Sequence, residues 1–92
     1  MELYSSEKDK RCLIHIFETG LLRFYNSEYG KETFLNLNDV ITFSVDEYND
    51  LGYAKFYVIL NGNISVLLTV YDEETEKDLI EILNSYLERR KK

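Results

Sequence analysis

The chain has 92 residues, of which 45% are hydrophobic, enough for one folded domain at 1–92 and too few for two domains with separate cores. Cys12 is the only cysteine, which excludes an intrachain disulfide, and without a Cys/His cluster no structural zinc site is expected. The formal net charge of −6 disfavours attraction to phosphate backbones, so direct nucleic-acid binding is not expected.

The N-terminal residues and the overall composition give expectations about location and source. The sequence turns polar between Ser5 and Lys8, before an apolar run could act as a signal-peptide core. No run approaches the roughly 18 apolar residues of a membrane span. We therefore predict a cytoplasmic protein without a membrane partner. The absence of proline and tryptophan, with abundant isoleucine, asparagine and lysine, indicates the AT-rich codons of a low-GC bacterium or its phage.

Strands are predicted over most of residues 2–71, where short runs alternate apolar and polar side chains. A hairpin is expected around Gly20, because glycine adopts the positive φ of a final loop residue without steric cost. Asn38 and Asp39 indicate a corner. The strands expected before that corner are residues 2–5, 12–17, 21–25 and 33–37. The strand expected directly after it is residues 40–45.

The strongest hairpin pattern joins residues 53–60 to residues 64–71, and its register has two solutions. A two-residue turn at Asn61 and Gly62 would bury Tyr57 and Ile59 together with Val66 and Leu68. A three-residue loop ending at Asn63 gives the cleaner apolar face, and asparagine tolerates the left-handed conformation needed there. We favour this second register, whose inward face contains Phe56, Val58, Leu60, Ile64, Val66, Leu68 and Val70.

A helix is predicted at about residues 73–90. Asp72 stands where an N-cap belongs, Glu73 and Glu74 occupy the first turn, and basic residues end the segment, as the helix dipole favours. An apolar stripe recurs at helical spacing and comprises Leu79, Ile82, Leu83, Tyr86 and Leu87.

Six or seven strands followed by one amphipathic helix define an α+β chain. In this order, with the last hairpin at residues 56–70 and Leu79, Leu83 and Leu87 on the closing helix, the chain resembles a pleckstrin-homology-like domain. The resemblance implies a bent antiparallel sheet or partly open barrel with the helix at one open end. The tryptophan usual in the helix of lipid-binding members is missing. The alternative is a simple antiparallel sheet with one helix packed across it.

No residue pattern predicts catalysis, a cofactor or a metal. His15 has no cysteine or acid at a triad or metal-ligand spacing, and Cys12 beside apolar neighbours is expected to act as a small hydrophobe. Asp46, Glu47 and Asp50 crowd one turn, but Tyr48 stands where a calcium loop needs an oxygen ligand. We therefore expect a non-enzyme.

Two groups of residues are candidate binding sites. Lys8, Lys10 and Arg11 fall between the first two predicted strands, where the resemblance implies head-group contacts of phosphoinositide-binding domains. Glu7 and Asp9 interleave them, and a solvated loop is the alternative. The second group is the outward face of the last hairpin in the favoured register. Its residues are Tyr53, Tyr57, Ile59, Leu67 and Tyr71.

Tyrosine is enriched at protein interfaces, since its ring gives contact area at little entropic cost, and this chain has eight tyrosines. The alternative is that this face lies under the helix. We therefore expect a module that binds another protein or itself through Tyr53, Tyr57 and their neighbours; a phage or mobile-element inhibitor of a host defence protein is one version. Lipid or phosphate binding and acidic nucleic-acid mimicry are the alternatives.

Overall fold

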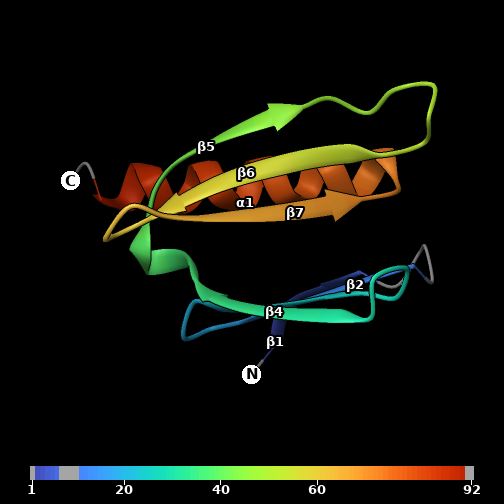
Figure 1. The fold of residues 1–92 in the computed structure, drawn as a ribbon. Coiled ribbons are helices and arrows are strands. Elements are labelled where there is room, and N and C mark those ends of the chain that lie inside the picture. Colours follow the sequence, from blue (N-terminus) through green and yellow to red (C-terminus); the bar gives the residue numbers. More distant parts are fainter. Residues whose placement is uncertain (1, 7–10, 91–92) are drawn as a thin grey trace.

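A computed structural model describes residues 2–6 and 11–90, which form two antiparallel sheets and a C-terminal helix, α1 (Glu73–Arg90) (Figure 1). The first sheet contains, in spatial order, β1 (Glu2–Ser6), β2 (Cys12–Phe17), β3 (Leu21–Asn26) and β4 (Lys31–Asn36). The second contains β5 (Val40–Asp46), β6 (Ala54–Leu60) and β7 (Ile64–Val70). The α+β class and the closing helix are thus confirmed.

The strands belong to two separate sheets, whereas the sequence predicted one bent sheet or a partly open barrel. A short 3-10 helix, Leu37–Asp39, separates β4 from β5, and the Asn36 side chain caps it by accepting a hydrogen bond from the Asn38 amide at 2.8 Å. Leu37 is fully buried, and its amide donates to the Gly20 carbonyl at 2.8 Å. Gly20 has φ of 93°, as predicted.

The core lies between the two sheets and α1. In β2 and in β6, buried residues alternate with half-buried ones, so each of these strands turns one face inward, as a period of two requires. Ile14 and Phe56 are among the largest fully buried side chains, and α1 contributes Leu79 and Leu83. Figure 1 shows α1 running along the second sheet, on the side away from the viewer.

The hairpin between β6 and β7 has the three-residue loop that the sequence favoured. Leu60 pairs with Ile64, and Asn63 has φ of 60°. The predicted inward face is buried at Phe56 and Val58. Ile64 departs from the prediction, because it adjoins the turn outside the core cluster and is 56% exposed.

The start of α1 is fixed by side-chain hydrogen bonds. The Asp72 Oδ2 accepts from both the amide and the hydroxyl of Thr75 at 3.0 Å, which confirms the predicted N-cap. The buried carboxylate of Glu76 accepts from the Tyr48 amide at 2.8 Å and ties the connection between β5 and β6 to the helix. Within the described ranges, no helix has the length and apolar character of a membrane span.

Candidate functional site

The outward side of the second sheet carries a cluster of aromatic and aliphatic side chains. Tyr57 pairs across the strands with Leu67, and Ile59 is the next outward residue of β6. Leu67 is 51% exposed, whereas Tyr53, Tyr57 and Ile59 are half-buried. The favoured register therefore puts Tyr57, Ile59 and Leu67 on an accessible face, whereas Tyr53, which precedes β6, also packs against the core cluster.

Tyr71 is the exception, and its predicted exposure is wrong. Its side chain is only 8% exposed, because the connection between β3 and β4 covers it. The Asn26 Nδ2 donates to the Tyr71 hydroxyl at 3.1 Å, and that hydroxyl donates to the Glu28 Oε2 at 3.1 Å. Burial raises the pKa of Tyr71, and Glu28 adds to the rise while the Asn26 hydrogen bond opposes it. These contacts hold the Tyr71 side chain inside the fold.

Arg11 belongs to the same network. Its guanidinium lies 4.3 Å from the centroid of the Tyr71 ring, and its Nη1 lies 3.9 Å from the Glu28 Oε1. Its carbonyl accepts from the Ser27 amide at 2.8 Å. These contacts give Arg11 a role in joining two connections of the fold. Lys8 and Lys10, the other predicted anion contacts, lie outside the described residues.

The connection between β3 and β4 adds a residue that sequence reasoning missed. Tyr29 is 74% exposed and lines two adjoining hollows beside Thr69. One hollow, of about 330 Å³, is lined by Phe24, Asn26, Tyr29, Lys31, Thr33, Leu67 and Thr69. The other, of about 130 Å³, is lined by Glu28, Tyr29, Tyr53, Lys55, Thr69 and Tyr71. We call Tyr29, Tyr53, Tyr57, Ile59 and Leu67 together the tyrosine face.

Charged side chains border the tyrosine face. Lys31 lines the larger hollow and Lys55 the smaller one, where its Nζ lies 5.4 Å from the centroid of the Tyr53 ring. The Tyr57 hydroxyl donates to the Asp46 Oδ2 at 3.2 Å. The face is therefore a partly apolar surface bordered by charges of both signs, with Lys31 and Lys55 on one hand and Glu28 and Asp46 on the other.

Cys12 and His15, the chain's one cysteine and one histidine, lie on β2. Cys12 is buried in the core, and the His15 Nδ1 lies 2.5 Å from the Glu2 Oε2 of the neighbouring strand. Among the described residues, no three His, Cys, Asp or Glu side chains gather in a way that could hold a metal.

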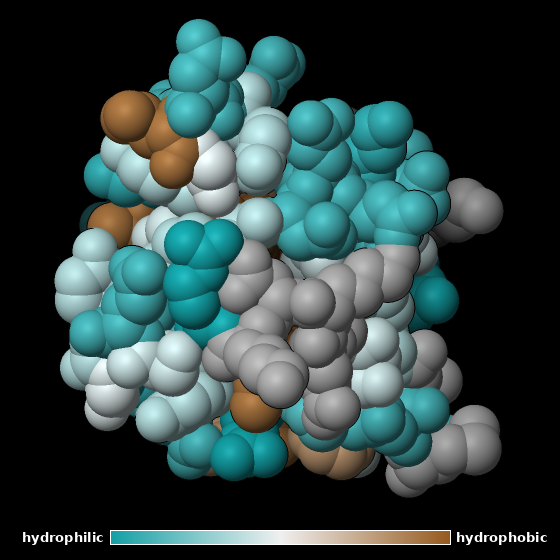
Figure 2. All heavy atoms as spheres, turned by 90° about the vertical axis from the view of Figure 1, so that its right-hand side faces the viewer, coloured by the Kyte–Doolittle hydropathy of each residue, from teal (hydrophilic) through white to brown (hydrophobic). Residues whose placement is uncertain are grey.

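Figure 2 faces the end of the molecule where α1 begins, and the coloured residues there are mainly hydrophilic.

No family model, curated protein or solved structure matches the chain.

Proposed function

We propose that this protein is a protein-binding module that contacts its partner through the tyrosine face. The observation that carries the proposal is the exposure of Leu67 and Tyr29, at 51% and 74%, around the larger hollow. The other members of the tyrosine face, Tyr53, Tyr57 and Ile59, are half-buried. Gathered apolar surface of this kind is typical of interaction sites, and tyrosine is enriched at their centres.

The charges around the tyrosine face favour a partner whose rim carries charges of both signs, because Glu28 lines the smaller hollow with Lys55 and Asp46 accepts from the Tyr57 hydroxyl. Lys31 and Lys55 lie beside Tyr29 and Tyr53 respectively. Opposite charges at the rim of an interface raise the association rate and select the partner, while the apolar centre supplies most of the affinity.

We also propose that the fold is pleckstrin-homology-like. Four antiparallel strands, three antiparallel strands and then one C-terminal helix follow one another in the order of a pleckstrin-homology-like domain. Arg11, one of the residues at the head-group position of such domains, is engaged with Glu28 and Tyr71. This engagement favours protein recognition over lipid-head-group recognition for this chain.

Affinity capture with three baits tests the proposed function. The baits are the wild-type protein, a Tyr29→Ala/Leu67→Ala variant, and a Phe34→Ala control, which removes a side chain that is 56% exposed on the first sheet. We expect a protein, or a second copy of this chain, that the wild-type and control baits retain and the double variant loses at least tenfold. Equal retention by all three baits would reject the tyrosine face as the contact surface.

A further inference from the structure

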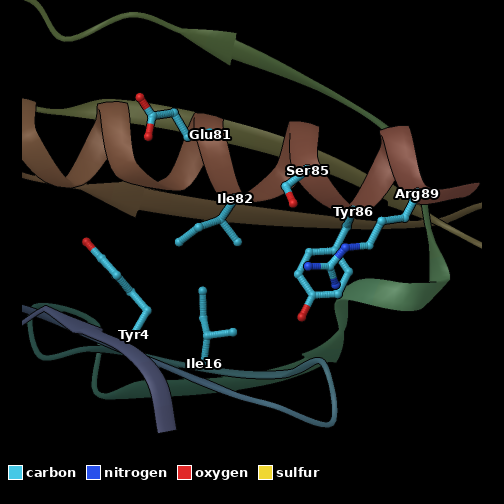
Figure 3. Close-up of a pocket in the computed structure, with 7 residues that line it drawn as sticks. All are labelled: Tyr4, Ile16, Glu81, Ile82, Ser85, Tyr86 and Arg89. Carbon is cyan, nitrogen blue, oxygen red and sulfur yellow. The ribbon is translucent and has the colours of Figure 1, made fainter.

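A separate groove of about 290 Å³ lies between α1 and the first two strands, and it shares no residue with the tyrosine face (Figure 3). It is lined by Tyr4, Ile16, Glu81, Ile82, Ser85, Tyr86 and Arg89. Its volume is near the lower end of the range for small-molecule sites, which is roughly 300 to 1,000 Å³.

The floor of the groove is apolar and held in place. Ile16 is 1% exposed, and Ile82 and Tyr86, about one helical turn apart, point toward the strands from α1 (Figure 3). Tyr4 is fixed because its hydroxyl donates to the Asp78 Oδ2 at 3.0 Å. A ligand would thus meet an apolar surface that needs little reordering.

The rim of the groove is polar and has opposite charges at its two ends. Glu81, Ser85 and Arg89 follow one another at four-residue spacing along α1, so Glu81 and Arg89 are separated by about 12 Å of helix. The Arg89 guanidinium lies 5.0 Å from the centroid of the Tyr86 ring. Arg89 is exposed, so its guanidinium N–H donors lie at the solvent-facing rim, where an anion can reach them.

We propose that this groove binds a small amphipathic monocarboxylate, with its hydrocarbon chain over the half-buried Tyr4 and Ile82 and its carboxylate on Arg89. A guanidinium matches a carboxylate in a bidentate geometry, and the Ser85 hydroxyl, one helical turn before Arg89, is a further donor on the rim. Glu81 repels an anion from the opposite end, which sets the orientation of the ligand.

The charge and the lining decide the class of ligand. A phosphate monoester carries about −1.5 to −2 charges, which one arginine in a protein of net charge −6 balances poorly, so a single negative charge fits better. A peptide would bring backbone N–H and C=O groups that need partners, whereas the floor offers mainly carbon. A hydrocarbon chain has no such need.

Titration of the ¹⁵N-labelled protein with octanoate, below its micelle concentration, tests this proposal. We expect saturable amide shifts centred on Ile82, Ser85 and Tyr86. Octanamide, which has the same chain without the charge, should bind about tenfold more weakly, because a hydrogen-bonded ion pair is lost. Arg89→Gln should weaken octanoate by a similar factor.

Lys77→Gln is the matched control, since it removes the same charge from an exposed position of α1 outside the groove and should change octanoate affinity less than twofold. Both variants replace exposed side chains, so the fold is retained. The proposal is overturned by amide shifts that do not saturate or that lie elsewhere, and by equal binding of octanoate to Arg89→Gln. It is also overturned if trivaline, a short apolar peptide, binds more tightly than octanoate.

Discussion

Tyr71 is the residue whose environment has the clearest consequence for stability. Its hydroxyl joins Asn26 to Glu28, and burial raises its pKa. In the unfolded chain a tyrosine loses its proton near pH 10, whereas in the folded protein Tyr71 keeps it to higher pH. Above pH 10 the unfolded state therefore binds fewer protons, and the free energy of unfolding falls as pH rises through the folded pKa.

Tyr71→Phe tests this link. Near pH 7 the variant should lose about 1 kcal/mol in the free energy of unfolding, because Asn26 and Glu28 lose their shared partner. Urea unfolding of both proteins at pH 8, 9, 10 and 11 should show the difference shrinking at the highest pH, since only the wild type loses this contribution. A difference that stays constant or grows would contradict the account.

At the scale of elements, α1 closes the core. Leu83 is 1% exposed and belongs to the core cluster with Leu79 and Phe56. Leu83→Ala should lower the free energy of unfolding by about 2 to 5 kcal/mol, the cost of a cavity at a buried leucine. Asn84→Ala is the control, because Asn84 is exposed on the same helix, and it should change stability by about 0.5 kcal/mol or less. Similar unfolding midpoints for the two variants would show that α1 does not cover the core.

The elements that could be predicted are those whose signals lie within a few residues. The cap at Asp72 and the loop ending at Asn63 each depend on neighbours in the sequence, and both were predicted. The burial of Tyr71 depends on Asn26 and Glu28, which are 45 and 43 residues away, so no local pattern encodes it. Separation into two sheets likewise depends on tertiary packing.

At the scale of the whole molecule, local sequence patterns predicted only those parts of the candidate site that lie on one hairpin. Alternation along β6 and β7 predicted the accessible side chains of Tyr57 and Leu67, because strand periodicity and loop length fix the face of each residue. Tyr29 comes from a turn of the other sheet and reaches the hollow only through the tertiary fold. The groove on α1 could not be predicted for the same reason, since the helical spacing of Ile82 and Tyr86 indicates only an apolar stripe.

The central claim is that the tyrosine face binds a partner without being needed for folding. The dissociation constant of the captured complex, measured for wild type and Tyr57→Ala alongside their melting temperatures, tests it most directly. We predict at least a tenfold weaker complex, since a ring at the centre of an interface contributes about 2 kcal/mol or more. The melting temperature should fall by no more than about 8 °C, because Tyr57 is half-buried. An unchanged dissociation constant, or a variant that no longer folds cooperatively, would contradict the claim.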